Sequence, residues 1–134
     1  NIIVSLNHWV SGWIDWNIVL DARGGPNHVG NFCGAPIMVD TTSGYVYYTP
    51  VYYILAQFSR SIRPGDRALR CVTTPPALDS DAIHASASIN DQGLLSVQVL
   101  NTTQRPLAYD LQIGAQHARA TIAANALQTV QVQL

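Results

Sequence analysis

The chain of 134 residues contains no glutamate and no lysine. Its eight acidic residues are all aspartates and its seven basic residues are all arginines, which gives a formal net charge of −1. Charged residues make up 11% of the chain, whereas a typical soluble domain has about 25%. This composition argues against a nucleic-acid partner, which requires a clustered basic face. It also predicts that further polypeptide covers part of this surface.

Long apolar runs and metal-ligand spacings are lacking as well. No apolar run approaches the roughly 20 residues needed to span a bilayer, so we expect no transmembrane segment. No spacing of Cys and His resembles a zinc site, and we expect no metal. The two cysteines, Cys33 and Cys71, are compatible with one disulfide and equally with two buried free thiols.

Hydrophobic periodicity predicts both extended segments and a helix in the first part of the chain. The apolar run over residues 1–6 predicts a short strand, and residues 36–40 predict another extended piece. Thr49-Pro50 predicts the start of a helix that ends near residue 62. The apolar side chains of this helix recur at helical spacing, at Val51, Leu55, Phe58 and Ile62.

Beyond residue 64 the period changes to two. Residues 82–89 and 94–100 flank Asn90-Asp91-Gln92-Gly93, which is a hairpin signature. Apolar and polar residues alternate again over 107–113 and 130–134, and short strands at this spacing predict an antiparallel β-sandwich. Asn101-Thr102-Thr103 matches a glycosylation acceptor, although the same residues suit a turn at the end of a strand.

The segment from Gly12 to Phe32 concentrates aromatic and amide side chains around a tight loop. It contains Gly12-Trp13-Ile14-Asp15-Trp16-Asn17, then Gly24-Gly25-Pro26-Asn27, then Asn31-Phe32. An indole face offers apolar area to the C–H groups of a sugar ring. An amide both donates and accepts hydrogen bonds, which suits the recognition of hydroxyls. These residue types predict a carbohydrate pocket.

Together with Pro36-Ile37-Met38-Val39-Asp40 and Tyr52-Tyr53-Ile54-Leu55, these motifs resemble the C-terminal part of glycoside hydrolase family 30, best known for the glucosylceramidases. The resemblance implies an α/β plus all-β fold, in which the last β/α unit of a (β/α)8 TIM barrel precedes an antiparallel β-sandwich. Residues 1–64 would be the barrel piece, with residues 1–6 as its eighth strand. Residues 65–134 would be the sandwich.

The same resemblance implies a retaining β-glucosidase that cleaves β-linked glucose by double displacement without a cofactor. Its catalytic glutamates would lie upstream, so we expect no catalytic residue in this chain and no activity from it alone. The implied partners are a β-glucoside or glucosylceramide-like glycolipid and the missing N-terminal part of the same protein. Such an enzyme would act in sphingolipid and carbohydrate metabolism.

By resemblance, Trp16, Asn31 and Phe32 line the glucose site, and Asp15 and Asn17 support it from behind. Other interpretations stand beside these roles. Trp16 is also compatible with a core tryptophan that closes the barrel, and Asn31 with a turn former. Asp15 is more typical of an anchor for a neighbouring strand than of a substrate contact.

The carboxylates of this region do not form a catalytic pair in the sequence. Retaining hydrolysis needs two carboxyl groups about 5 Å apart. Asp21 and Asp40 are spaced for turn and strand-end roles, and nothing pairs either of them with Asp15.

Two alternative functions stay open. The first keeps the family and changes the sugar, to a β-1,6-glucanase, β-xylosidase or xylanase. The second is a non-catalytic carbohydrate-binding β-sandwich module. A lone barrel strand and an amphipathic helix argue against the second, because without partners they would expose apolar surface and strand edges.

Overall fold

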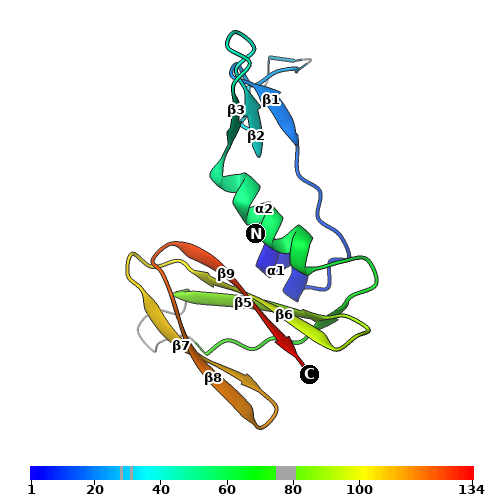
Figure 1. Cartoon of the computed structure of the whole chain (residues 1–134), viewed down its shortest axis with the longest axis vertical. Coiled ribbons are helices and arrows are strands. Elements are labelled where there is room, and N and C mark those ends of the chain that lie inside the picture. The colour runs from blue at the N-terminus through cyan, green and yellow to red at the C-terminus, as the bar shows by residue number, and fades with distance from the viewer. Residues whose placement is uncertain (28, 31, 75–80) are drawn as a thin grey trace. The chain divides into compact units, whose positions relative to one another are not determined.

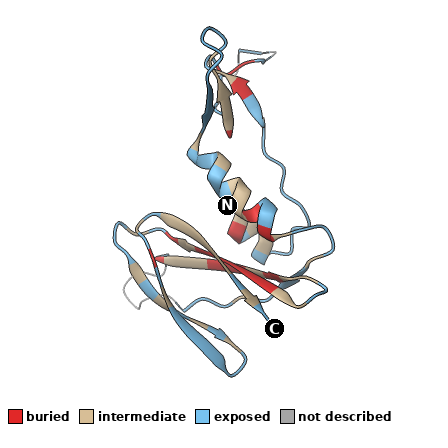
Figure 2. Ribbon diagram, viewed as in Figure 1, coloured by how far each residue is buried: buried red, intermediate tan, exposed pale blue. Residues whose placement is uncertain are grey.

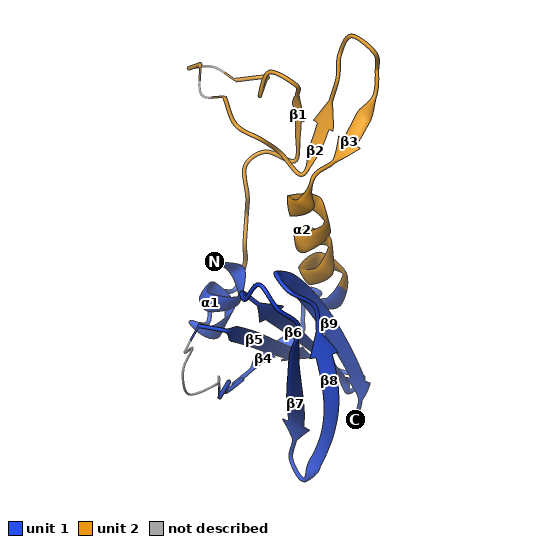
Figure 3. Ribbon diagram, turned by 90° about the vertical axis from the view of Figure 1, so that its left-hand side faces the viewer, with its two compact units in different colours: residues 1–11, 61–134 blue, residues 12–60 orange. Residues whose placement is uncertain are grey.

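The computed structural model describes residues 1–27, 29–30, 32–74 and 81–134. The chain forms two compact units, one of residues 12–60 and one of residues 1–11 with 61–134 (Figure 3). We call the unit of residues 1–11 and 61–134 the β-rich unit. Residues 1–11 therefore group with the β-strands that follow residue 61, whereas the expected boundary separated them. The assignment of residues 1–64 to a barrel and 65–134 to a sandwich stays a prediction.

The unit of residues 12–60 contains a three-stranded sheet (Figure 1). β1 (Val19–Asp21) pairs parallel with β2 (Ile37–Val39), and β2 pairs antiparallel with β3 (Val46–Tyr48). Leu20, in the middle of β1, is 1% exposed and is the most buried apolar residue of this sheet. β2 confirms the extended piece expected near residues 36–40, and these short strands do not by themselves form a barrel.

Helix α2 (Pro50–Ser61) confirms the helix expected from the apolar stripe. The Thr49 hydroxyl lies within hydrogen-bond distance of two carbonyl oxygens, those of Ala35 at 2.9 Å and Pro36 at 3.2 Å. These contacts tie the start of the helix to the segment that precedes β2. Within the helix, Phe58 is buried, with 8% of its surface exposed.

Helix α1 (Ile2–Asn7) occupies the segment for which we expected a strand, so that prediction is wrong. The Ser5 N–H donates to the Asn1 carbonyl at 2.9 Å, and the Asn7 amide donates to the Ala85 carbonyl at 2.9 Å. An apolar run this short has no distinguishable period, which is why the sequence did not separate helix from strand. The expected role of residues 1–6 as an eighth barrel strand is wrong for the same reason.

Neither α1 nor α2, the two helices in the described ranges, has the length and apolarity required to cross a membrane.

The described residues of the β-rich unit also form two antiparallel sheets, with strand orders β4-β5-β6-β9 and β7-β8 (Figure 3). The strands are β4 (Arg67–Leu69), β5 (Ile83–Ile89), β6 (Leu94–Asn101), β7 (Leu107–Ile113), β8 (Gln116–Ile122) and β9 (Ala126–Gln133). The expected hairpin between β5 and β6 and the alternating strands β7 and β9 are confirmed. The arrangement is compatible with the expected sandwich, and it adds β4 and β8, which the sequence did not indicate.

Strand β6 is the buried centre of this unit (Figure 2). One of its faces contributes to the apolar core, which consists of Ala85, Leu95, Val97, Val99 and Ile122. On the other face, Gln98 is fully buried, donates from Nε2 to the Ser61 hydroxyl at 2.9 Å and accepts from the Ser86 hydroxyl at 3.2 Å. A polar residue is therefore tolerated there because its amide has partners.

Asn101, the last residue of β6, joins three segments of the chain. Its Nδ2 donates to the carbonyls of Arg105 and Ala123, both at 2.8 Å. Its Oδ1 accepts from the N–H of Thr103 at 2.9 Å and from the Thr103 hydroxyl at 2.8 Å. The residue is 0% exposed, and both donors and both acceptor positions of the amide are used. Asn101 therefore has a structural role, and its Nδ2 is not accessible for glycosylation.

We expect Asn101→Ala to lower the free energy of unfolding of the complete protein by about 3 kcal/mol, because buried backbone groups left without partners cost about 1–3 kcal/mol each. Urea denaturation measures the change. Gln112→Ala is the control, because its exposed amide makes one 3.2 Å bond to the Gly114 carbonyl. Equal stability of the two variants would contradict the role of Asn101.

Candidate functional site

The Trp-rich segment is an irregular stretch that leads into β1. Trp16 is 72% exposed, and its backbone N–H donates to Asp15 Oδ1 at 2.9 Å. Asn17 is half-buried, and the Trp16–Asn17 peptide bond is cis. The described residues thus leave the indole uncovered, as a contact with a sugar ring requires. The roles of these three residues stay predictions.

The loop that follows β1 is folded around the carboxylate of Asp21. Asp21 Oδ1 accepts from the backbone N–H groups of Arg23 at 2.8 Å and Gly25 at 2.9 Å. The Asp21 N–H donates to the Gly25 carbonyl at 2.6 Å, and the Gly24 N–H donates to the Asp21 carbonyl at 2.9 Å. These bonds hold residues 21–25 as one tight turn that continues from β1.

Asn27 closes the next part of this loop. Its Nδ2 donates to the Gly24 carbonyl at 3.4 Å, and its Oδ1 accepts from the Gly30 N–H at 2.9 Å. Phe32 follows with 72% of its surface exposed. Asn31, the third residue predicted to bind the sugar, lies outside the described residues. The structure thus describes two of the three predicted contacts, both as exposed aromatic side chains.

The three aspartates of this unit all accept hydrogen bonds from nearby backbone N–H groups, and Asp40 does so in the turn between β2 and β3. Asp40 Oδ1 accepts from the Thr42 N–H at 2.9 Å, and Oδ2 accepts from the Ser43 hydroxyl at 2.6 Å. The Ser43 hydroxyl, followed by the Thr42 N–H, holds the pKa of Asp40 below its ordinary value of 3.8. Because both carboxylate oxygens bond groups of the same turn, Asp40 is a turn residue, in agreement with the sequence.

The cysteines and histidines do not assemble a metal centre in the part of the chain that the structure describes, where no group of three or more potential ligands occurs. Cys33 and Cys71 are both free thiols, so the structure contains no disulfide between them. Burial raises the pKa of the Cys71 thiol, which lowers the fraction of reactive thiolate.

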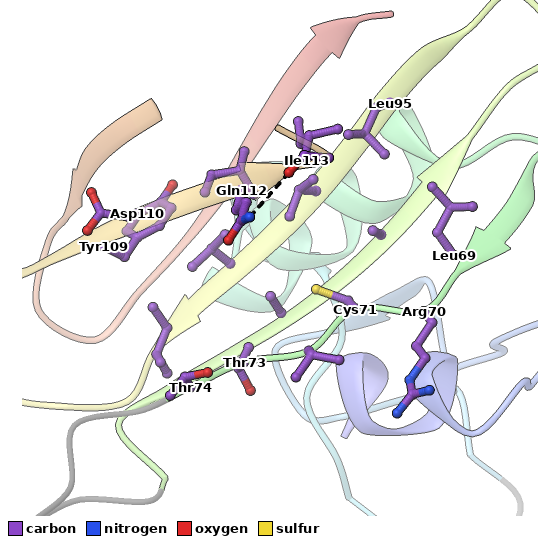
Figure 4. A pocket seen from close by; sticks show the side chains of 18 of the residues that line it. Leu69, Arg70, Cys71, Thr73, Thr74, Leu95, Tyr109, Asp110, Gln112 and Ile113 are labelled. Atoms are coloured by element: carbon purple, nitrogen blue, oxygen red, sulfur yellow. Dashed lines mark hydrogen bonds between the residues drawn. The ribbon is translucent and has the colours of Figure 1, made fainter. Parts of the chain in front are cut away.

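A cleft of about 760 Å³ lies in the β-rich unit, lined by β5, β6, β7 and residues 69–74 (Figure 4). Its lining includes apolar core residues such as Val97, and Tyr109 donates from its hydroxyl to Gln128 Oε1 at 3.1 Å. Among the described residues that line it, Asp110 supplies the one carboxylate. The cleft contains none of the predicted site residues, and it has no carboxylate pair for glycoside cleavage.

Sequence reasoning missed how much the loop depends on Asp21 and Gly24. Asp21 was expected to be a turn residue, but its carboxylate organises the whole turn from residue 21 to residue 25. The Asp-x-x-Gly-Gly spacing, which is compatible with a side chain bonding its own backbone, was the available signal. Gly24 left no such signal, because its closest neighbour in space, Cys33, lies nine positions later.

Comparison with known proteins places these features in a family. Residues 1–62 match the glycosyl hydrolase family 30 TIM-barrel domain. The lysosomal acid glucosylceramidase of Mus musculus is 38% identical over 101 residues, which cover 75% of this chain and 19% of that protein. An endo-1,6-β-D-glucanase of Trichoderma harzianum is 28% identical over 72% of this chain and 20% of its own length.

Among solved structures, SrfJ from Salmonella typhimurium matches with a TM-score of 0.84 and 27% identity, over 92% of this chain and 27% of that one. This chain thus spans about a fifth of the length of the two relatives, at 19% and 20%, and about a quarter of the solved structure, at 27%.

We expect Asp40→Asn to destabilise the complete protein at neutral pH and to have less effect in acid. Because hydrogen bonds lower the folded pKa of Asp40 below 3.8, the ionised group stabilises the fold above that value, and this contribution is lost as the pH falls through the folded pKa. Urea denaturation at about pH 7 and about pH 3 measures the free energy of unfolding of the variant and of the wild type. The difference between the two should be smaller at the lower pH. Asp91→Asn, in the exposed hairpin turn, removes the same charge and is the control. A difference that does not vary with pH would contradict this account.

Proposed function

We propose that this chain, which belongs to glycosyl hydrolase family 30, is the C-terminal part of a retaining β-glucosidase of the glucosylceramidase type. The similarity to the mouse lysosomal acid glucosylceramidase, at 38% identity over 75% of the chain, is the observation that carries this proposal. Family membership supports a glycoside hydrolase for the complete protein. β-Linked glucose as the sugar and a glucosylceramide-like glycolipid as the substrate are the finer parts of the proposal.

In the proposed reaction, one carboxylate attacks the anomeric carbon while a carboxylic acid protonates the leaving oxygen, which forms a glycosyl-enzyme intermediate. Water then cleaves this intermediate with the second group acting as base, so the β configuration is retained. This chain has no glutamate, and Asp15, Asp21 and Asp40 accept hydrogen bonds from nearby backbone N–H groups. We therefore assign both catalytic carboxylates to the rest of the protein.

The contribution of this chain would be to hold the sugar. Trp16 would present its indole face to the ring, and Phe32 would add a second apolar contact. Asn31 would bond sugar hydroxyls, while Asp15 would keep the backbone of Trp16 in place through the 2.9 Å bond to its N–H. Asn17, half-buried beside them, would support the segment from behind. Residues 1–64 would belong to the catalytic barrel and residues 65–134 to the sandwich.

The complete protein tests this proposal. We expect it to hydrolyse an aryl β-glucoside and glucosylceramide and to release the β anomer of glucose first, which NMR detects before mutarotation. The 134-residue chain alone should give no turnover under the same conditions. Release of the α anomer, or turnover by the chain alone, would contradict the proposed mechanism.

A second candidate keeps the chemistry and changes the substrate to a β-1,6-linked glucan. The similarity to the Trichoderma harzianum endo-1,6-β-D-glucanase, 28% identical over 72% of the chain, favours it over the other sugars of the family. The same assay with β-1,6-glucan beside glucosylceramide separates the two. Faster cleavage of the glucan would replace the glucosylceramidase assignment.

We expect Trp16→Ala in the complete protein to lower kcat/KM for an aryl β-glucoside by at least about tenfold, which corresponds to about 1.4 kcal/mol. The loss follows from removal of the apolar face that would contact the sugar. Stability should change little, because 72% of Trp16 is exposed. Trp9→Ala is the matched control, because Trp9 is an equally large side chain with 66% exposure outside the predicted site. Near-normal turnover by the Trp16 variant would remove this residue from the site.

A further inference from the structure

We infer that Gly24 is a positioning residue for Phe32, and that the absence of a side chain at Gly24 sets where the Phe32 ring meets the sugar. The inference rests on the proposed function, because Phe32 is given a substrate contact there. It concerns a residue that does not itself touch the substrate. Gly24 would act through the backbone of residues 32 and 33.

The close approach of two backbone segments at Gly24 is the first observation. Gly24 has a φ of +76°, and a Cβ built on it would lie 2.8 Å from both the nitrogen and the carbonyl oxygen of Cys33. The same Cβ would lie 3.1 Å from the Phe32 Cα. Ordinary contacts begin near 3.4 Å, so any side chain at this position must displace main-chain atoms rather than a flexible side chain.

The Gly24 side of this contact is anchored. Its N–H donates to the Asp21 carbonyl at 2.9 Å, and the adjacent Gly25 N–H donates to the Asp21 carboxylate at 2.9 Å. Asp21 is itself the last residue of β1, where it pairs with Val39 of β2. A Cβ at residue 24 therefore cannot be relieved easily by moving the turn.

The segment on the opposite side of the contact, which contains Phe32 and Cys33, is less tightly held. The segment is held again at Ala35, whose carbonyl accepts from the Thr49 hydroxyl at 2.9 Å. Between the Gly24–Gly25 turn and Ala35, the chain is open around two residues. Gly34 has nothing within 4 Å of the position its Cβ would take, and Phe32 is 72% exposed. The strain of a side chain at Gly24 would thus be relieved by movement of Phe32 and Cys33.

Such a movement matters because apolar contact is short-ranged. A radial gap of about 0.5–1 Å forfeits roughly a quarter to a half of the dispersion energy between two groups. Gly24 would therefore affect sugar binding although its own atoms stay away from the sugar.

The test compares Gly24→Ala with Gly44→Ala in the complete protein, with an aryl β-glucoside as substrate. Gly44 has a φ of +74°, almost equal to that of Gly24, and nothing lies within 4 Å of the position of its Cβ. Both variants therefore carry the cost of a side chain at positive φ, and only Gly24→Ala collides with Cys33. We expect Gly24→Ala to raise KM at least about fivefold, with a smaller change in kcat, and Gly44→Ala to leave both near wild type.

A double-mutant cycle asks whether the effect passes through Phe32. In a Phe32→Ala background, Gly24→Ala should raise KM by less than about twofold, because no ring is left to displace. An equal KM effect in the two backgrounds would overturn the inference. If Gly24→Ala does not fold, Asp21→Ala takes its place in the cycle, since it removes the two bonds that hold residues 23 and 25.

The reactivity of Cys33 gives a readout that does not depend on catalysis. Alkylation followed by peptide mass spectrometry should show a rate at Cys33 changed several-fold in Gly24→Ala and unchanged in Gly44→Ala. Cys71 is the internal reference, because burial raises its thiol pKa. An unchanged KM and an unchanged Cys33 rate in Gly24→Ala, with an active wild type, would overturn this inference alone. A wild-type protein that cleaves no β-glucoside would instead overturn the proposed function, and with it the role of Phe32 at a sugar.

Discussion

The β-rich unit depends on one constraint, which is that β6 has neither a free edge nor a free face. β5 and β9 pair with it along almost its whole length. A slip of one residue would turn Val97 toward the polar face and Gln98 into the apolar core, so the pairing has one acceptable register. That register also fixes both ends of the strand. Asn90 accepts hydrogen bonds from two N–H groups in the turn before β6, and Asn101 donates to the carbonyls of Arg105 and Ala123 after it.

The unit that carries the candidate site has a different balance between burial and exposure. Its sheet is short, yet Ile14 is 96% exposed, Ile18 74% and Val29 71%. Apolar side chains left this exposed are available for contact with further polypeptide. The low share of charged residues in the sequence pointed in the same direction. Both observations fit the proposal that the rest of a catalytic barrel covers this unit and brings its carboxylates to the site.

The sequence alone predicted those elements in which the hydrophobic period repeats often enough to be recognised. Helix α2 repeats its apolar residues over about three turns, and the β5–β6 hairpin and β7 repeat theirs over several alternations. α1 failed because its six residues are too few to distinguish a period of 3.6 from a continuous apolar strand. β8 was missed because its residues Gln116–Ile122 are mostly exposed and polar. This segment forms a strand because it pairs with β7, and that pairing is not encoded in the local pattern of apolar residues.

The same limit explains what was found and what was missed at the site. Trp16 and Phe32 are predicted from the sequence because aromatic residues cluster around a glycine-rich loop, and their role at a sugar stays a prediction. The close approach at Gly24 is visible only in the structure, because it involves the backbone of Cys33, nine positions later in the chain. Recognition of a neutral sugar ring requires apolar faces and amides, whereas cleavage requires two carboxyl groups in different protonation states. The aspartates of this unit accept hydrogen bonds from nearby backbone N–H groups. This fits the proposal that the chain recognises the sugar while the rest of the protein supplies the catalytic carboxylates.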